Sequence, residues 1–148
     1  MKFTRLYFMC IFCDIIKEQE PTRKYKHNYW YIIQDKYPVN KGHLLIVPKR
    51  HINKVGELNQ SEWVSLQNVL ELVQQLICDE EMQIEYFGKI ITTEDTYPDG
   101  FNIGINEGEA AGQTINHLHI HVIPRYLGDV EDPTGGVRGV IPNKQKYK

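Results

Sequence analysis

The feature that most constrains this chain is a run in which histidine alternates with aliphatic residues. Residues 117–124 read HLHIHVIP. Successive side chains on a strand point to opposite faces, so His117, His119 and His121 share one face and the aliphatic residues between them face a core. A lone strand histidine is most often structural, but three neighbouring imidazoles cannot all be charged at low cost, and their pKa values should differ. The run predicts a half-buried strand from Ile115 to Ile123, ended by Pro124, with a chemically active face.

The rest of the pattern predicts an α+β domain with an antiparallel sheet. Further strands are expected at Asn28–Ile33, His43–Val47 and Phe101–Ile105, where β-branched, aromatic or alternating apolar residues gather. One clear helix begins after Asn59, with Glu62 placed for a capping box. Apolar residues recur along it at helical spacing: Trp63, Leu66, Leu70, Val73 and Ile77. Because strands precede and follow a single good helix, the pattern favours α+β over a doubly wound fold.

Composition excludes several classes of protein. The 148 residues suffice for one domain with a proper core, and 41% hydrophobic with 24% charged residues argues against disorder. A formal charge of −2 argues against binding extended nucleic acid but leaves a small phosphorylated ligand open. No apolar run approaches the roughly 20 residues of a membrane span. Three cysteines give no secreted disulfide framework, so a cytoplasmic location is expected.

Both ends of the chain are expected to lie outside the domain. Met9 offers a second start, in which case residues 1–8 form a poorly ordered leader. A signal peptide is disfavoured because the apolar part is short and no small-residue cleavage site follows. Residues 9–127 contain all the predicted elements, and residues 128–148 form a Gly- and Pro-containing tail without periodicity.

Two kinds of site explain three imidazoles on one strand face. One is a metal site, because neutral imidazoles are common ligands of zinc and related ions. The other is covalent catalysis, in which one imidazole attacks phosphorus and its neighbours hold the phosphoryl oxygens. The loop before the strand favours the second, because Gly108 and Gly112 allow close backbone approach and the neutral side chains of Asn106, Gln113 and Thr114 suit phosphate.

Three segments resemble the histidine triad (HIT) family of nucleotide hydrolases and transferases. The most specific is residues 111–125, which read AGQTINHLHIHVIPR. Residues 10–16 (CIFCDII) resemble the family's opening segment, and residues 41–51 (KGHLLIVPKRH) resemble its central strand. The resemblance implies a fold with one long helix and a short N-terminal helix. It also implies a homodimer, paired through the helix and a strand, whose antiparallel sheet is continuous across both copies.

The resemblance further implies a purine nucleotide or dinucleoside polyphosphate as substrate and no organic cofactor. His119 matches the family's nucleophile, which attacks the α-phosphorus and forms a nucleotidyl-histidine intermediate that water hydrolyses. The positions that match phosphate contacts are His121, Gln113, Thr114 and Asn106. Asp35 matches the ribose contact, which suits an acceptor-only carboxylate, and His43 matches a position that supports the triad. Arg125 either neutralises a phosphate or lies exposed beyond the strand.

The cysteines leave two readings open. Cys10 and Cys13 form half a zinc site by their spacing, and without a second pair of ligands small buried thiols are the slightly preferred reading. Some family members with this opening bind zinc, and the resemblance then implies His51 and His117 as the other two ligands. Two thiolates and two imidazoles make a closed, structural site. Cys78, late on the long helix, is expected in the core.

The function expected from the sequence is hydrolysis at the α-phosphate of a dinucleoside polyphosphate or a purine nucleoside phosphoramidate. His121 favours the hydrolase branches, because glutamine replaces the third histidine in the uridylyltransferase and phosphorylase branches. Two alternatives remain: a nucleotidyltransferase or phosphorylase, in which another acceptor replaces water, and a nucleotide-binding scaffold with little turnover.

Overall fold

The computed structural model describes residues 10–22 and 26–147. The expected leader, residues 1–8, lies outside the described residues. The helices are α1 (Ile11–Gln19), α2 (Gln60–Ile77) and α3 (Glu80–Phe87), and the strands are β1 (Trp30–Gln34), β2 (Leu44–Pro48), β3 (Gly100–Gly104) and β4 (Ile120–Arg125). Within these described ranges, no helix is both long and apolar enough to cross a membrane.

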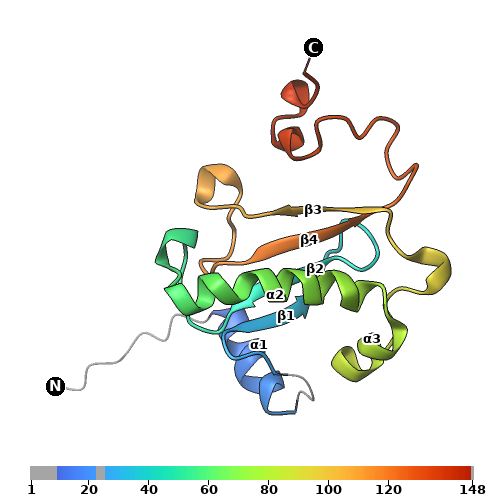
Figure 1. Ribbon diagram of the computed structural model, residues 1–148. Coiled ribbons are helices and arrows are strands. Elements are labelled where there is room, and N and C mark those ends of the chain that lie inside the picture. Colours follow the sequence, from blue (N-terminus) through green and yellow to red (C-terminus); the bar gives the residue numbers. More distant parts are fainter. Residues whose placement is uncertain (1–9, 23–25, 148) are drawn as a thin grey trace.

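The strands form one antiparallel sheet in the order β1-β2-β4-β3, with helices on both faces (Figure 1). Residues 30, 32, 44, 46, 120 and 122 of the sheet pack with α2 in the larger core cluster. The alternate residues of β1 and β2 pack against Phe12 and Ile16 of α1 in a second cluster. Leu45 of β2 pairs with His121 of β4, so His121 lies on the α1 face of the sheet. The α+β prediction is confirmed.

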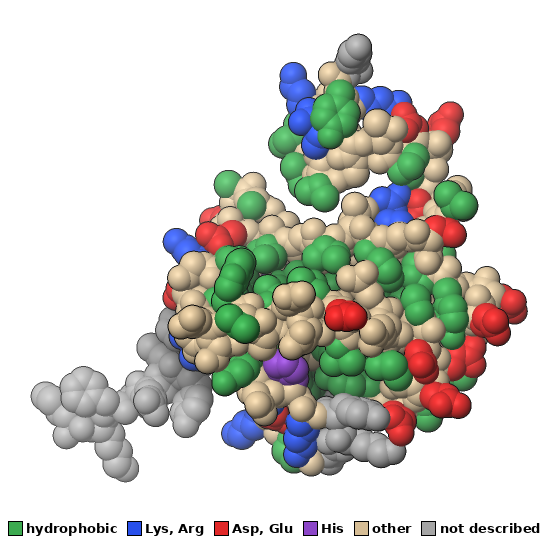
Figure 2. Space-filling model, viewed as in Figure 1, with side chains coloured by type: hydrophobic (Ala, Val, Ile, Leu, Met, Phe, Trp, Pro, Cys, Tyr) green, Lys and Arg blue, Asp and Glu red, His purple; other side chains and the backbone are tan. Residues whose placement is uncertain are grey.

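Helix α2 has the predicted beginning. The Asn59 side chain accepts from the Glu62 amide at 2.9 Å, and the Glu62 carboxylate accepts from the Asn59 amide at 2.8 Å. The predicted apolar stripe is not buried along its whole length, however. Val73 and Ile77 are fully buried, whereas Trp63 is 57% exposed. Figure 2 shows hydrophobic side chains gathered on the side of the molecule where α2 lies.

The histidine strand is shorter at its start than predicted. Strand β4 begins at Ile120 and includes Pro124 and Arg125, so the predicted range Ile115–Ile123 is wrong at both ends. Residues before Ile120 leave the ladder because their backbone groups bond elsewhere. The Leu118 amide donates to the Ile52 carbonyl at 2.6 Å, and the His117 carbonyl accepts from the ring of His119.

Two further predictions differ from the structure. Helix α3 was not expected, although Asp79 caps it and Gly88 ends it in the left-handed conformation, both of which are ordinary sequence signals. The prediction that Cys78 lies in the core is wrong, because α2 ends at Ile77 and leaves Cys78 exposed.

The C-terminal segment after Leu127 folds on itself beyond β3 (Figures 1 and 2). It contains two short 3-10 turns, Gly136–Val140 and Pro142–Lys144. Arg138 donates to the Gln145 and Lys144 carbonyls, and Lys146 forms an ion pair with Asp132 at 2.9 Å. These contacts join residues within the tail, and Asp129 joins the tail to the domain by accepting from Asn40 and Arg125.

Candidate active site and the adjoining cysteine–histidine cluster

A pocket of about 640 Å³ lies on the α1 face of the sheet. Its apolar lining comes from Ile11, Phe12 and Ile15 of α1 and from Ile33, Leu45 and Ile123 of the sheet. Its polar lining includes seven predicted site residues: Asp35, His43, Asn106, Gly112, Thr114, His119 and His121. An apolar enclosure with a few convergent polar groups is typical of a small-molecule site.

His119 presents one free ring nitrogen to this pocket. Its Nδ1 lies 2.8 Å from the His117 carbonyl oxygen, which can only accept a hydrogen bond. Nδ1 therefore carries the proton of the neutral ring, and Nε2 keeps its lone pair. The ring is 7% exposed and packs edge-on against Phe12, with centroids 5.2 Å apart. Its orientation is thus fixed, with a nucleophilic atom left over.

His121 stands beside two further polar groups. Its Nδ1 lies 3.0 Å from Nε2 of His43 and 3.9 Å from the Asp35 carboxylate. Burial, followed by the neighbouring His119 and His43, lowers the pKa of His121 to about 4, against the opposing effect of Asp35. Burial also lowers the pKa of His43, again against Asp35. Both rings are therefore neutral at pH 7.

His117 belongs to a different cluster, although it lies on the same run. The four ligand atoms of Cys10, Cys13, His51 and His117 all lie within 4.8 Å of one another. Nδ1 of His117 lies 3.3 Å from the Cys10 sulfur and 3.5 Å from the Cys13 sulfur, and Nδ1 of His51 lies 3.3 Å from the Cys13 sulfur. Tetrahedral zinc with bonds of about 2.3 Å to sulfur and 2.0 Å to nitrogen places such ligands roughly 3.5 Å apart.

The protons of this cluster also fit a metal. Nε2 of His117 lies 2.7 Å from the Pro48 carbonyl, so Nε2 carries the ring proton and Nδ1 faces the thiols with its lone pair. Burial, followed by a hydrogen bond with Cys10, raises the pKa of the Cys13 thiol to about 11. A divalent cation would supply the charge that two neighbouring thiolates need.

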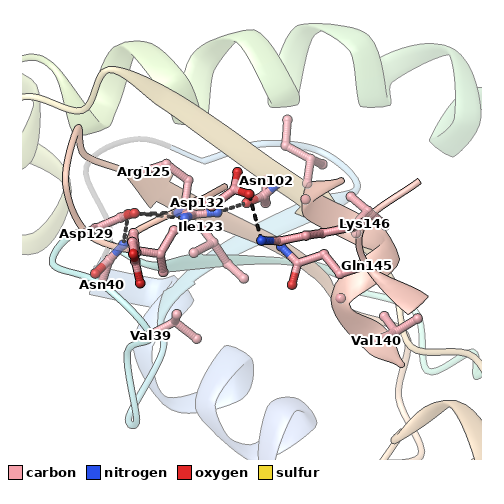
Figure 3. A pocket seen from close by; sticks show the side chains of 17 residues that line it. Val39, Asn40, Asn102, Ile123, Arg125, Asp129, Asp132, Val140, Gln145 and Lys146 are labelled. Carbon is pink, nitrogen blue, oxygen red and sulfur yellow. Dashed lines mark hydrogen bonds and ion pairs between the residues drawn. The ribbon is translucent and has the colours of Figure 1, made fainter. Parts of the chain in front are cut away.

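Two predicted groups lie outside the lining of this pocket, Gln113 and Arg125. Gln113 does not line it; its side-chain oxygen accepts from the Gly108 amide at 2.8 Å, and its nitrogen donates to the Asn53 carbonyl. Gln113 thereby shapes the loop that carries Gly112 and Thr114. Arg125 forms a two-point ion pair with Asp129 at 2.7 and 2.8 Å and donates to Asn102, beside a second cavity of about 1130 Å³ between β3 and the tail (Figure 3).

Sequence reasoning missed the apolar walls of the pocket. Phe12 touches the rings of both His117 and His119, with centroids 5.8 and 5.2 Å apart. The sequence signal that could have identified Phe12 was its position two residues after Cys10, in the opening segment. The backbone amide of Val39, which donates to the His43 ring at 3.1 Å, left no signal in the sequence.

The fold and the site define a class: α+β proteins that hold reactive imidazoles over an apolar pocket. The HIT domain model matches residues 17–128, so the chain belongs to the histidine triad family. The chain is 38% identical over 124 residues to an uncharacterised HIT-like protein of Methanocaldococcus jannaschii, covering 83% of this chain and 84% of that protein.

Other relatives have named activities. An adenosine 5'-monophosphoramidase of Schizosaccharomyces pombe is 31% identical, with 78% of this chain and 74% of that protein covered. An AP-4-A phosphorylase of Mycobacterium tuberculosis is 35% identical, with 76% of this chain but only 51% of that protein covered. A zinc-bound histidine triad family protein of Mycobacterium smegmatis superposes with a TM-score of 0.59 at 31% identity, covering 83% of this chain and 79% of that one.

Proposed function

We propose that this chain is a nucleotide hydrolase that cleaves at the α-phosphate of a purine nucleoside phosphoramidate or a dinucleoside polyphosphate. The observation that carries the proposal is the hydrogen bond from Nδ1 of His119 to the His117 carbonyl. It leaves Nε2 of an imidazole in a fixed orientation as a nucleophile in a nucleotide-sized pocket. The phosphoramidase relative and the family's nucleotide chemistry support this assignment.

The reaction proceeds in two displacements at phosphorus. In the first, Nε2 of His119 forms a bond to the α-phosphorus, and the P–N or P–O bond to the leaving group breaks with its electron pair; an amine leaving group takes up one proton from solvent, and a polyphosphate leaves as the anion. The His117 carbonyl stabilises the cationic ring through the Nδ1 proton. In the second, water forms the new P–O bond, releases a proton to solvent, and returns an electron pair to Nε2.

Other pocket residues hold the nucleotide. His121, Thr114 and Asn106 bind phosphoryl oxygens as neutral donors, and Gly112, with φ of 91°, brings the loop backbone close. Asp35 accepts from the ribose hydroxyls, and the apolar walls receive the base. Gln113 acts on the phosphate through the loop that it braces.

Zinc is part of the proposal. Cys10, Cys13, His51 and His117 have the donor atoms, spacing and proton arrangement of a closed tetrahedral site. The zinc-bound neighbour supports it. When bound, the metal supplies structural cross-linking of α1 to the histidine run and no reactive position. No organic cofactor is required for either displacement.

A homodimer in the cytoplasm completes the proposal. Trp63 and Val64 of α2 are 57% and 66% exposed, and β3 is an edge strand whose outer side pairs with no other described strand. A second copy that covers both would extend the sheet across the dimer. Neither extended nucleic acid nor a membrane is a partner in this proposal.

Two other functions make different predictions. A phosphorylase would use inorganic phosphate in the second displacement, as the name of the Mycobacterium tuberculosis relative indicates for that protein. A scaffold would bind nucleotide with little turnover. Incubation with diadenosine polyphosphates and adenosine phosphoramidate, with and without inorganic phosphate, separates the three. Phosphate-independent release of AMP supports hydrolysis.

The nucleophile is tested by trapping. Rapid acid-free quenching followed by intact mass measurement should show a nucleotidyl adduct on wild type and none on His119→Ala. Turnover should fall by a factor on the order of 10⁴, while AMP still binds. His27→Ala, which changes a ring outside the pocket, is the control. Full turnover in His119→Ala would show that the assignment is wrong.

A further inference from the structure

Asp35, His43 and His121 form a second group of potential metal ligands, inside the pocket. Nε2 of His43 lies 3.0 Å from Nδ1 of His121 and 3.5 Å from the Asp35 carboxylate, which lies 3.9 Å from Nδ1 of His121. Ligands on a tetrahedral zinc lie about 3.3 Å apart when bonds are near 2.0 Å. Spacing alone therefore does not separate a metal site from a hydrogen-bonded chain of rings.

The backbone amide of Val39 distinguishes a hydrogen-bonded chain of rings from a metal site. It donates to Nδ1 of His43 at 3.1 Å, and an amide N–H can only donate. Nδ1 of His43 must therefore accept, so the single proton of the neutral ring lies on Nε2. That N–H faces Nδ1 of His121, which in turn accepts. The ring proton of His121 consequently lies on Nε2, the nitrogen left for a ligand in the pocket.

We propose that the Val39 amide and His43 fix His121 as an Nε2–H donor to the phosphate and keep divalent cations out of the Asp35–His43–His121 group. Its phosphate role rests on the proposed function; the proton positions do not. His43 and Val39 are positioning residues, because they act through His121. A cation bound to Nε2 of His43 would require the ring proton to lie on Nδ1. The Nδ1–H group and the Val39 N–H group would then point at each other, and this repulsion excludes the metal.

The cysteine-containing cluster shows the opposite arrangement within the same molecule. The Pro48 carbonyl lies behind His117 and accepts a hydrogen bond from Nε2–H, which leaves the lone pair of Nδ1 for a metal. Behind His43 stands the Val39 amide, which leaves Nε2 as a donor. A carbonyl behind the ring leaves a lone pair on the far nitrogen, and an amide behind it leaves an N–H donor there.

His43 is needed because Asp35 competes for the same nitrogen. The carboxylate lies 3.9 Å from Nδ1 of His121 and can only accept. If the His43 donor is removed, a small approach of Asp35 would favour a proton on Nδ1 of His121. Nε2 would then turn a lone pair toward the phosphate, which repels it.

The proton positions can be measured without substrate by long-range proton–nitrogen NMR of the histidine rings near pH 7. Wild type should show His43 and His121 protonated at Nε2. His43→Leu should move the His121 proton to Nδ1, and adding Asp35→Asn should reverse that change. His43→Gln, which keeps an N–H donor at similar reach, should retain the wild-type form and serves as the second variant if His43→Leu fails to fold. An Nδ1 proton on either ring of wild type overturns the proposal.

Binding supplies the second measurement. The affinity for AMP should fall about tenfold in His43→Leu and change little in His43→Gln, because one hydrogen bond to a charged group is lost. Zinc titration of a Cys10→Ser, Cys13→Ser variant should show no ion retained by the pocket. Zinc binding that disappears on His43→Gln overturns the metal exclusion. The wild-type tautomers are independent of turnover, so failure of the hydrolase proposal would leave them standing.

Discussion

The Cys10 sulfur lies 3.3 Å from Nδ1 of His117, although the two residues are 107 positions apart in the sequence. This contact joins the beginning of α1 to the histidine run. Phe12, two residues after Cys10, packs against both His117 and His119. The cysteine–histidine cluster thus shares a wall with the pocket and is placed to hold the surroundings of His119 in position.

Freshly purified protein should contain one zinc ion per chain. Cys10→Ser with Cys13→Ser should remove it and lower the melting temperature, because the link between α1 and His117 is lost. Metal analysis measures the first effect and calorimetry the second. Amide hydrogen exchange in α1 should quicken in the variant. Cys78→Ser, at an exposed position, should retain the metal. Zinc-free wild type would contradict the assignment.

Acid should destabilise the fold between about pH 6.5 and pH 4. The pKa of His121 is lowered from 6.5 to about 4, and that of His43 is also lowered, so the unfolded chain binds more protons in this range. The stability contribution is intact above pH 6.5 and is lost as the pH falls. Urea unfolding across this range, in the zinc-free double-serine variant, measures the slope.

His121→Gln is the matched variant for the acid experiment, because it removes one of the two titrating groups. Its stability should depend less steeply on pH than that of the parent. The groups that face His121 are His119, His43 and Asp35. An unchanged slope would mean that His121 does not titrate with the lowered pKa.

Asn59→Ala should reduce the free energy of unfolding by about 1 kcal/mol, because the amide of Glu62 loses its acceptor. The cap also holds Glu62, which accepts two hydrogen bonds from Arg50 at 2.9 Å, next to His51. Chemical denaturation measures the loss. Gln67→Ala, on the exposed face of α2, should change stability by much less. Equal effects would remove the capping explanation.

Trp63→Glu should shift the proposed dimer toward monomer, because it places a charge on the exposed apolar face of α2. Sedimentation equilibrium over a range of concentrations measures the dissociation constant, which should rise at least about tenfold. Lys89→Glu, at an exposed site beyond α3, is the control. A wild-type chain that stays monomeric at high concentration would refute the dimer.

Local pattern was enough to predict several features of the fold. The alternation around Ile120 placed His121 on the face opposite the α2 core, and the Asn59–Glu62 spacing placed the start of α2. These follow from strand and helix periodicity, which short stretches of sequence contain. Helix α3 carried similar signals at Asp79 and Gly88 and could have been found in the same way.

The sequence by itself therefore determined which residue types gather in the histidine run and its neighbouring segments, and which face of an element they share. Only the tertiary structure decided which nitrogen of each imidazole meets a hydrogen-bond partner. That choice depends on which atom lies behind the ring: the His117 carbonyl behind His119, the Pro48 carbonyl behind His117, and the Val39 amide behind His43. Every residue except proline offers both kinds of backbone group, so residue identity seldom reveals which one meets a ring. Folding brings that group into contact and thereby fixes the proton.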